Sequence, residues 1–128
     1  MAKKYKLITP REYEKLDKRE LELICNGCGT EGWKGKLVPD TIYGVNITKA
    51  CNIHDFMYFN GMTMKDKKEA DDVFLKNLLT IVNHSPKWSS WLNRWRRKRA
   101  RKYYLAVKHF GKKAYMAGKH GFKNYTHE

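Results

Sequence analysis

The sequence predicts a single all-α domain, and three observations lead to that fold class. Apolar residues recur at helical spacing in several long segments, capping and stop residues lie at the ends of those segments, and no stretch alternates clearly like a strand. With 128 residues, the chain suits one domain with one hydrophobic core. We expect this domain to span residues 1–128, with its core at about 9–112 and a coil-like tail at 113–128.

The first predicted helix begins near the amino terminus. Thr9 suits the N-cap, Pro10 suits the first helical position, and acidic residues follow in the first turns of REYEKLDKRELELIC. Its irregular apolar stripe consists of Tyr13, Leu16, Leu23 and Ile24. Residues 25–44 then form a loop that holds five of the nine glycines. Loops of this length inside a compact domain are usually functional or disordered, and the cysteines and glycines favour an ordered, functional loop.

Two further helices follow this loop. The second helix begins at a cap at Asn46 or Thr48 and ends at Asn60-Gly61. Offsets of three and four place a set of its residues on one face: Ile47, Ala50, Cys51, His54 and Tyr58. The third helix covers residues 65–83, opens at Asp66 and stops at Ser85-Pro86. Its expected core face consists of Ala70, Val73, Phe74, Asn77, Leu78 and Ile81.

The fourth predicted helix covers residues 87–117 and combines aromatic with basic residues. Its apolar stripe consists of Trp88, Trp91, Leu92 and Trp95, extended by Tyr103, Val107, Phe110 and Ala114, and its polar side reads RRKRARK. One interpretation is a stripe that packs into the core. The other is an interface with anionic lipid, because tryptophan suits head-group depth and basic residues attract an anionic leaflet. The residues of that interface would be Trp88, Trp91, Trp95, Arg96 and Arg97.

The net charge of +14 predicts attraction to polyanions, either nucleic acid or an anionic membrane surface. Arginines on nucleic-acid phosphates are the rival to lipid binding for the basic helix, and salt would weaken both. The start MAKKYKLITPREYEK has no apolar run of signal-peptide length, and no stretch approaches a membrane span. We therefore expect a protein that is cytoplasmic, associated with a particle such as a virion, or exported without a Sec signal. Nothing in the sequence indicates an oligomeric state.

The three cysteines allow a metal-binding interpretation. Cys25, Cys28, Cys51 and His54 form a CxxC…CxxH pattern, and four such ligands in two pairs suit tetrahedral zinc. The odd cysteine count then has a reason, since His54 is the fourth ligand. With its basic helix on nucleic acid, the chain would be a zinc-binding nucleic-acid module.

A second interpretation uses His54 as a base. A histidine works as a base at neutral pH when a carboxylate orients one ring nitrogen and stabilises the imidazolium. Asp71 shares a face with Phe74 and Leu78, so we expect it to point inward toward His54. Asp72 has Lys76 four residues on, which predicts a solvated ion pair.

Asp55 could hold a hard cation beside this histidine. Adjacent helical residues point about 100° apart, so Asp55 does not orient His54. Loop carbonyls, carboxylates and waters are the usual ligands of calcium. The glycines within residues 26–29 allow the loop to turn its carbonyls toward a cation. The sequence thus fits a calcium ion between this loop and Asp55.

The stretch CNIHDFMY at residues 51–58 resembles the CxxHDxxY active-site helix of phospholipase A2, particularly its small prokaryotic and fungal secreted branch. The order of four pieces supports the resemblance: Asn26-Gly27-Cys28, the stretch ACNIHDF at 50–56, ADDVF at 70–74 and YYLAVKHFG at 103–111. The resemblance covers about residues 20–112. It implies an antiparallel helix pair that carries the His/Asp site, a glycine-rich calcium loop and a long basic carboxyl-terminal helix.

The resemblance also implies roles for individual residues. His54 would take a proton from water, Asp71 would align His54, and Tyr58 would hydrogen-bond Asp71. Calcium would be bound by Asp55 and by main-chain oxygens of Asn26, Gly27 and Gly29, and would polarise the sn-2 ester carbonyl of a phospholipid. Cys28 and Cys51 match a disulfide-bonded pair of the family, which leaves Cys25 as the odd thiol.

Some features depart from the family pattern. Asn26 stands where this branch tends to have an acid, the loop from Cys28 to Pro39 is longer, and a second disulfide is missing. These departures suggest weaker calcium binding or work in a reducing compartment or particle. They also fit a catalytically degenerate, lipid-binding relative. The leading hypothesis is a calcium-dependent phospholipase A2 acting on anionic membranes.

Overall fold

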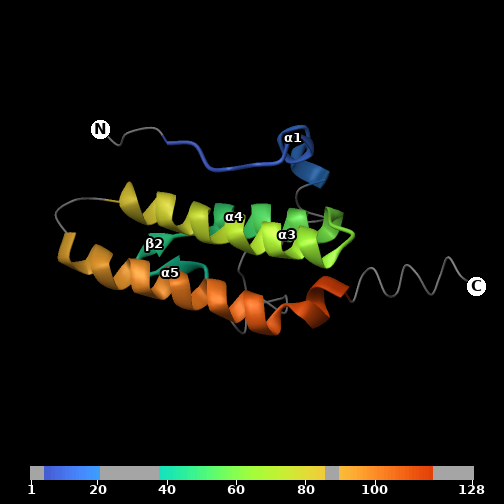
Figure 1. The fold of residues 1–128 in the computed structure, drawn as a ribbon. Coiled ribbons are helices and arrows are strands. Elements are labelled where there is room, and N and C mark those ends of the chain that lie inside the picture. The colour runs from blue at the N-terminus through green and yellow to red at the C-terminus, as the bar shows by residue number, and fades with distance from the viewer. Residues whose placement is uncertain (1–4, 21–37, 86–89, 117–128) are drawn as a thin grey trace, which may run out of the picture.

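The structure is a computed structural model that describes residues 5–20, 38–85 and 90–116. It is mostly helical, with one small sheet (Figure 1). The elements, in chain order, are α1 (Arg11–Glu14), β1 (Thr41–Ile42), β2 (Val45–Asn46), α3 (Thr48–Asn60), α4 (Met64–Asn83) and α5 (Ser90–Phe110). The all-α class predicted from the sequence is therefore confirmed at the level of a mostly helical chain.

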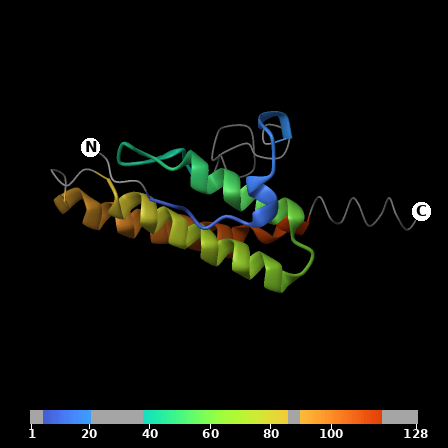
Figure 2. The ribbon, with the colours of Figure 1, turned by 90° about the horizontal axis from the view of Figure 1, so that it is seen from above.

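Three long helices form the body of the molecule, and α4 packs against both α3 and α5. Figures 1 and 2 show α4 running antiparallel to each of these two neighbours. The amino-terminal segment and α1 lie on one side of α3 and α4, and α5 lies on the other side (Figure 1). Fully buried apolar side chains from all three helices meet between them, including Ile53 of α3, Phe74 and Leu78 of α4, and Val107 of α5.

The start of α4 follows from its local sequence. The Thr63 side chain accepts a hydrogen bond from the Asp66 backbone, and the Asp66 side chain accepts one from the Thr63 backbone. This reciprocal capping box satisfies two backbone donors that a helix start leaves unpaired. The predicted opening at Asp66 was close, with Thr63 as the cap itself. Two residues before Thr63, Gly61 is the C-cap of α3, as predicted.

The amino-terminal segment is fixed to α4 by a buried amide. Asn77 is fully buried, its Oδ1 accepts from the Ile8 backbone at 2.7 Å, and its Nδ2 donates to the Ile8 carbonyl at 3.0 Å. These two bonds explain how a polar residue occupies the predicted core face of α4. Leu7 and Tyr115 are also buried, so the core extends slightly beyond the expected range 9–112.

The expectation of no strand was wrong for residues 41–46. β1 and β2 pair antiparallel, with Thr41 opposite Asn46 and Ile42 opposite Val45. The connecting residues Tyr43 and Gly44 both have positive φ, 43° and 82°. Two consecutive residues with positive φ match the twist of a two-residue hairpin. Strands of two residues are too short to show alternation, so the sequence pattern predicts only a loop at this hairpin.

The first predicted helix is interrupted. α1 ends at Glu14, and a second helical turn begins at 18–20. Between them, the Asp17 carboxylate accepts from the Glu20 backbone at 2.8 Å, and the Glu20 carboxylate accepts from the Asp17 backbone at 3.2 Å. Asp17 therefore caps a new turn instead of continuing the old one. Of the predicted stripe, Tyr13 and Leu16 are half-buried, and Leu23 and Ile24 lie outside the described residues.

The fourth predicted helix is shorter than expected, because α5 ends at Phe110 and a separate helical turn at 112–116 follows Gly111. The prediction of a core stripe was wrong for two of its tryptophans, because Trp91 and Trp95 are 70% and 51% exposed. The buried residues of α5 are Asn93, Arg96, Ala100, Tyr103 and Val107, so the predicted stripe is confirmed for Tyr103 and Val107. Phe110 is exposed, and Trp88 lies outside the described residues. No helix among the described residues is both long and apolar enough to span a bilayer.

Candidate active site

α3 directs one face toward α4. Cys51, His54 and Tyr58 recur at spacings of three and four residues and are all buried, as the sequence predicted. His54 is the central residue of this face, with 1% of its surface exposed. Its ring packs between Phe74 of α4 and Tyr58, at centroid distances of 4.5 and 4.1 Å. This packing fixes the orientation of the imidazole before any ligand is bound.

Asp71 of α4 points inward and meets this face, as predicted. Its Oδ1 lies 2.8 Å from His54 Nε2 and accepts a hydrogen bond from the Tyr58 hydroxyl at 2.7 Å. Asp71 is buried as well, so both contacts are shielded from solvent. The structure therefore brings together the three predicted catalytic residues, His54, Asp71 and Tyr58, around a single carboxylate oxygen.

Lys67 completes this cluster and was missed in the sequence analysis. It lies one turn before Asp71 on α4 and is only 4% exposed. Its Nζ donates to Asp71 Oδ2 at 2.7 Å and to the Val107 carbonyl at 3.2 Å, in the last turn of α5. The signal was present in the sequence, because Lys67 and Asp71 are four residues apart and so share a helix face.

The neighbouring acid, Asp72, faces outward. Its predicted partner was Lys76, and this was wrong: Oδ2 accepts from Lys68 Nζ at 2.8 Å, four residues before it. Its other oxygen accepts from the Tyr104 hydroxyl of α5 at 3.1 Å. Lys68 and Asp72 are solvent-accessible. Lys68 and Tyr104 therefore bind Asp72 at the surface in the same way as Lys67 and Tyr58 bind Asp71 in the core.

The charge state of the buried cluster follows from its contacts. Burial alone would raise the pKa of Asp71, but hydrogen bonds from His54, Lys67 and Tyr58 outweigh it and hold the pKa below its usual range. Burial and the negative charge of Asp71 raise the pKa of Tyr58 far above that of a free tyrosine. At neutral pH, Asp71 is therefore an ionised acceptor and Tyr58 a protonated donor. Such a carboxylate can hold a histidine in one tautomer and stabilise its protonated form.

Asp55 follows His54 on α3 and is half-buried. Its carboxylate is a hard oxygen donor of the kind that calcium prefers. The loop positions expected to supply the other ligands, Asn26, Gly27 and Gly29, lie outside the described residues. Within the described ranges, no group of three or more His, Cys, Asp or Glu residues could hold a metal ion. The calcium site therefore stays a prediction.

Cys51 forms a disulfide bond. The other cysteines of the chain, Cys25 and Cys28, lie outside the described residues, so the predicted partner Cys28 stays a prediction. Zinc is bound by thiolates, and a disulfide-bonded cysteine has none to offer. His54 Nε2 is also engaged with Asp71. This geometry therefore gives no support to the hypothesis of zinc bound by Cys25, Cys28, Cys51 and His54.

The residues expected at a lipid interface are separated by the structure. Trp91 and Trp95 are exposed, whereas Arg97 is half-buried and donates to Asn83 Oδ1 at 3.3 Å. The prediction was wrong for Arg96, which is 5% exposed. Its guanidinium donates to the Tyr43 carbonyl and to Asn93 Oδ1, both at 2.8 Å. Arg96 thus fixes the β-hairpin to α5 and is not available to a membrane.

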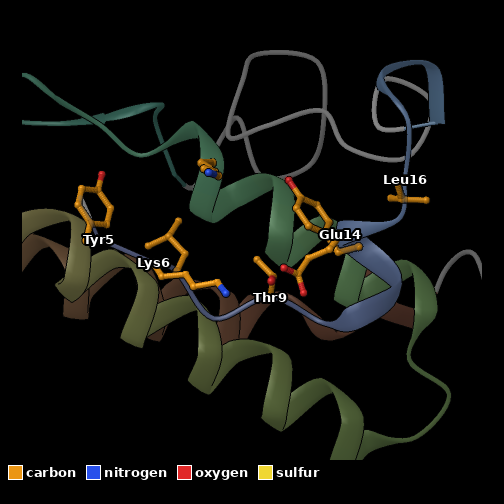
Figure 3. Close-up of a pocket in the computed structure, with 8 residues that line it drawn as sticks. Tyr5, Lys6, Thr9, Glu14 and Leu16 are labelled. Atoms are coloured by element: carbon orange, nitrogen blue, oxygen red, sulfur yellow. The ribbon is translucent and has the colours of Figure 1, made fainter.

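A cleft of about 430 Å³ lies between the amino-terminal segment, α1 and the start of α3 (Figure 3). Its lining mixes apolar and charged side chains: Tyr5, Lys6, Leu7, Thr9, Tyr13, Glu14, Leu16 and Lys49. None of the catalytic candidates lines it. The cleft is therefore separate from the His54–Asp71 pair.

No protein-family model, no curated protein and no solved structure matches this chain.

Proposed function

We propose that this protein is a calcium-dependent phospholipase A2 that hydrolyses the sn-2 ester of phospholipids at anionic membrane surfaces. The observation that carries the proposal is the buried contact between His54 Nε2 and Asp71 Oδ1 at 2.8 Å, with the Tyr58 hydroxyl on the same oxygen. A surface histidine and aspartate can meet by chance. A buried imidazole held by a carboxylate with two further donors is an arrangement suited to proton transfer.

In this proposal, His54 is the general base. With Nε2 bonded to Asp71, Nδ1 takes the proton from a water molecule, and the resulting hydroxide forms a bond to the sn-2 carbonyl carbon. Asp71 stabilises the imidazolium, and the burial of the pair strengthens this electrostatic interaction. As the ester bond breaks, the imidazolium returns its proton to the departing alkoxide of the lysophospholipid. The second product is a fatty acid.

Asp55 is the described residue that we assign to calcium. The remaining ligands proposed from the sequence are main-chain oxygens of Asn26, Gly27 and Gly29. When bound, calcium would polarise the ester carbonyl and stabilise the oxyanion. The position of Asp55 next to His54 on α3 is what supports its assignment, because metal and base must both act at the same carbonyl.

The test is fatty-acid release from vesicles that contain anionic phospholipid, with millimolar calcium and with a chelator. We expect release that requires calcium and that falls at least about a hundredfold in His54→Asn, the scale of losing a general base. His84→Asn is the matched control, because His84 is exposed at the end of α4. Circular dichroism of each variant reports whether the helices are retained.

Three outcomes would contradict parts of the proposal. Full release by a folded His54→Asn variant would show that His54 is not the general base. Release that persists with the chelator would show that hydrolysis does not require calcium. Absence of release under both conditions, with vesicle binding retained, would identify a catalytically degenerate lipid-binding protein.

A further inference from the structure

Positive charge is concentrated in one half of the chain. Residues 1–72 contain 13 Lys and Arg and 12 Asp and Glu, whereas residues 73–128 contain 14 Lys and Arg and a single acid, Glu128. α5 carries most of the basic residues of the second half and no acid. Nearly all of the net charge of +14 therefore belongs to the part of the chain built around α5.

One face of α5 points away from the core along its whole length. Spacings of three and four residues connect its members, and all of them are exposed: Trp91, Trp95, Lys98, Lys102, Leu105 and His109. We name this set the α5 outer face. The residues that pack inward, such as Ala100 and Val107, lie on the opposite side of the helix. Figure 1 shows α5 on the side of the described residues away from the amino-terminal segment.

The α5 outer face combines large apolar side chains with cations. Trp91 is 70% exposed, Trp95 is 51% exposed and Leu105 is 46% exposed. Lys98 Nζ lies 5.2 Å from the centroid of the Trp95 ring, so its ammonium is held beside the indole. Indole rings combine a large apolar surface with one polar N–H, which suits the boundary between lipid head groups and acyl chains.

We propose that the α5 outer face binds the surface of an anionic lipid bilayer, with α5 lying parallel to the membrane plane. The indoles of Trp91 and Trp95 and the Leu105 side chain enter the head-group region. Lys98 and Lys102 contact the lipid phosphates. The 21 residues of α5 span about 30 Å, and a flat surface can contact the whole face at once.

Nucleic acid is the other polyanion that could attract this helix, and the apolar residues decide between the two. A phosphate backbone attracts cations, but it does not bury two exposed indoles and a leucine on the same face. A bilayer interface binds both kinds of side chain, because apolar groups enter the head-group boundary and basic groups contact the anionic phosphates. The mixture on the α5 outer face therefore favours lipid.

This inference deepens the proposed function, because it names the face of the protein that meets the membrane. The surface uses neither His54 nor Asp71, so it can be tested without hydrolysis. The full chain is sedimented with vesicles of phosphatidylcholine, with and without phosphatidylglycerol, in the presence of a calcium chelator. We expect binding that requires phosphatidylglycerol and weakens as salt is raised.

Two pairs of variants test the apolar and the charged parts separately. Trp91→Ala/Trp95→Ala should weaken binding about tenfold. Its control is Phe59→Ala/Met62→Ala, which removes side chains that are 67% and 73% exposed outside α5. Lys98→Gln/Lys102→Gln should weaken binding at least about tenfold. Its control is Lys15→Gln/Lys18→Gln, which removes the same charge from exposed positions near α1.

The proposal is supported if both α5 variants lose binding and both controls keep it. Equal losses of binding in an α5 variant and its control would overturn the proposal, because binding would then depend on exposed apolar or basic residues anywhere on the surface. Binding to an RNA or DNA duplex that depends on Lys98 and Lys102, without binding to anionic vesicles, would overturn it in favour of a nucleic-acid surface. A protein that fails to hydrolyse lipid but binds vesicles through α5 would leave this inference intact.

Discussion

Lys67 and Asp71 form an ion pair inside the core, with Nζ and Oδ2 2.7 Å apart and both side chains almost fully buried. Next to it on α4, Lys68 and Asp72 form a pair of the same spacing at the surface, at 2.8 Å. Each aspartate also accepts a hydrogen bond from a tyrosine, Tyr58 for Asp71 and Tyr104 for Asp72. The chain therefore contains a buried cluster and an exposed counterpart with the same three residue types.

Lys67→Met should lower the free energy of unfolding by about 3 kcal/mol, because a buried carboxylate loses its cation. Lys68→Met should lower it by less than about 1 kcal/mol, because water and salt screen the exposed pair. Urea unfolding at pH 7 measures both. Equal losses would show that the burial of Lys67 and Asp71 has no energetic consequence.

Tyr58→Phe should lower the free energy of unfolding by about 2 kcal/mol, since the hydrogen bond to an ionised Asp71 is buried. Tyr104→Phe is its control and should cost less than about 1 kcal/mol, because water can replace the hydroxyl at Asp72. The same urea experiment compares them. A Tyr58→Phe variant as stable as the wild type would mean that His54 and Lys67 alone hold Asp71.

Acid should destabilise the protein through Asp71, because contacts in the folded state lower the pKa of this carboxyl below its unfolded value. A lowered pKa gives stability that is fully present above the unfolded pKa of about 3.9 and is lost as the pH falls toward the folded pKa. In Lys67→Met, the pKa of Asp71 should rise toward its unfolded value, so this variant should lose less stability on acidification than the wild type, although it is less stable at pH 7. Urea midpoints measured between pH 6 and pH 3 test this difference.

Lys68→Met is the control for that experiment. Salt-bridge contacts with Lys68 also lower the pKa of Asp72, but this group is exposed and its contribution is screened. The acid dependence of Lys68→Met should therefore follow the wild type closely. Superimposable acid profiles of Lys67→Met and the wild type would contradict the proposed link between Lys67 and Asp71.

Gly111→Ala should affect both stability and the candidate site. A Cβ at this position would lie 2.3 Å from the Val107 carbonyl oxygen and 2.6 Å from the Tyr58 hydroxyl, so one of these groups must move. We expect a loss of about 2 kcal/mol, the scale of overpacking a core, and reduced lipid hydrolysis through displacement of Tyr58. Gly44→Ala meets no atom within 4 Å but has a φ of 82°, so it should cost about 1 kcal/mol and leave hydrolysis unchanged.

The parts of the site that could be predicted from sequence are those set by helical periodicity. Cys51, His54 and Tyr58 share a face because of their spacing, and the apolar neighbours of Asp71 at Phe74 and Leu78 gave its inward direction. Asp72, one residue later, turns away by the same geometry. Helical spacing alone was therefore enough to predict which of the two adjacent aspartates points inward.

Features that depend on contacts distant in sequence could not be predicted in this way. Lys67 is buried because α5 brings the Val107 carbonyl to its ammonium, 40 residues away in the chain. Arg96 is buried because the hairpin residue Tyr43 accepts its hydrogen bonds. In both cases a basic residue that reads as solvated in the sequence is held by a main-chain carbonyl of another element.

The bond from Lys67 to the last turn of α5 also sets the order in which the cluster can be completed during synthesis. α3 and α4 contain His54, Tyr58, Lys67 and Asp71, and they leave the ribosome first. The carbonyl that anchors Lys67 belongs to residue 107, and Gly111 must follow it to fit against Tyr58. A nascent chain that ends before residue 107 therefore lacks the anchor of Lys67, and the cluster can be completed only after residue 111 has been synthesised.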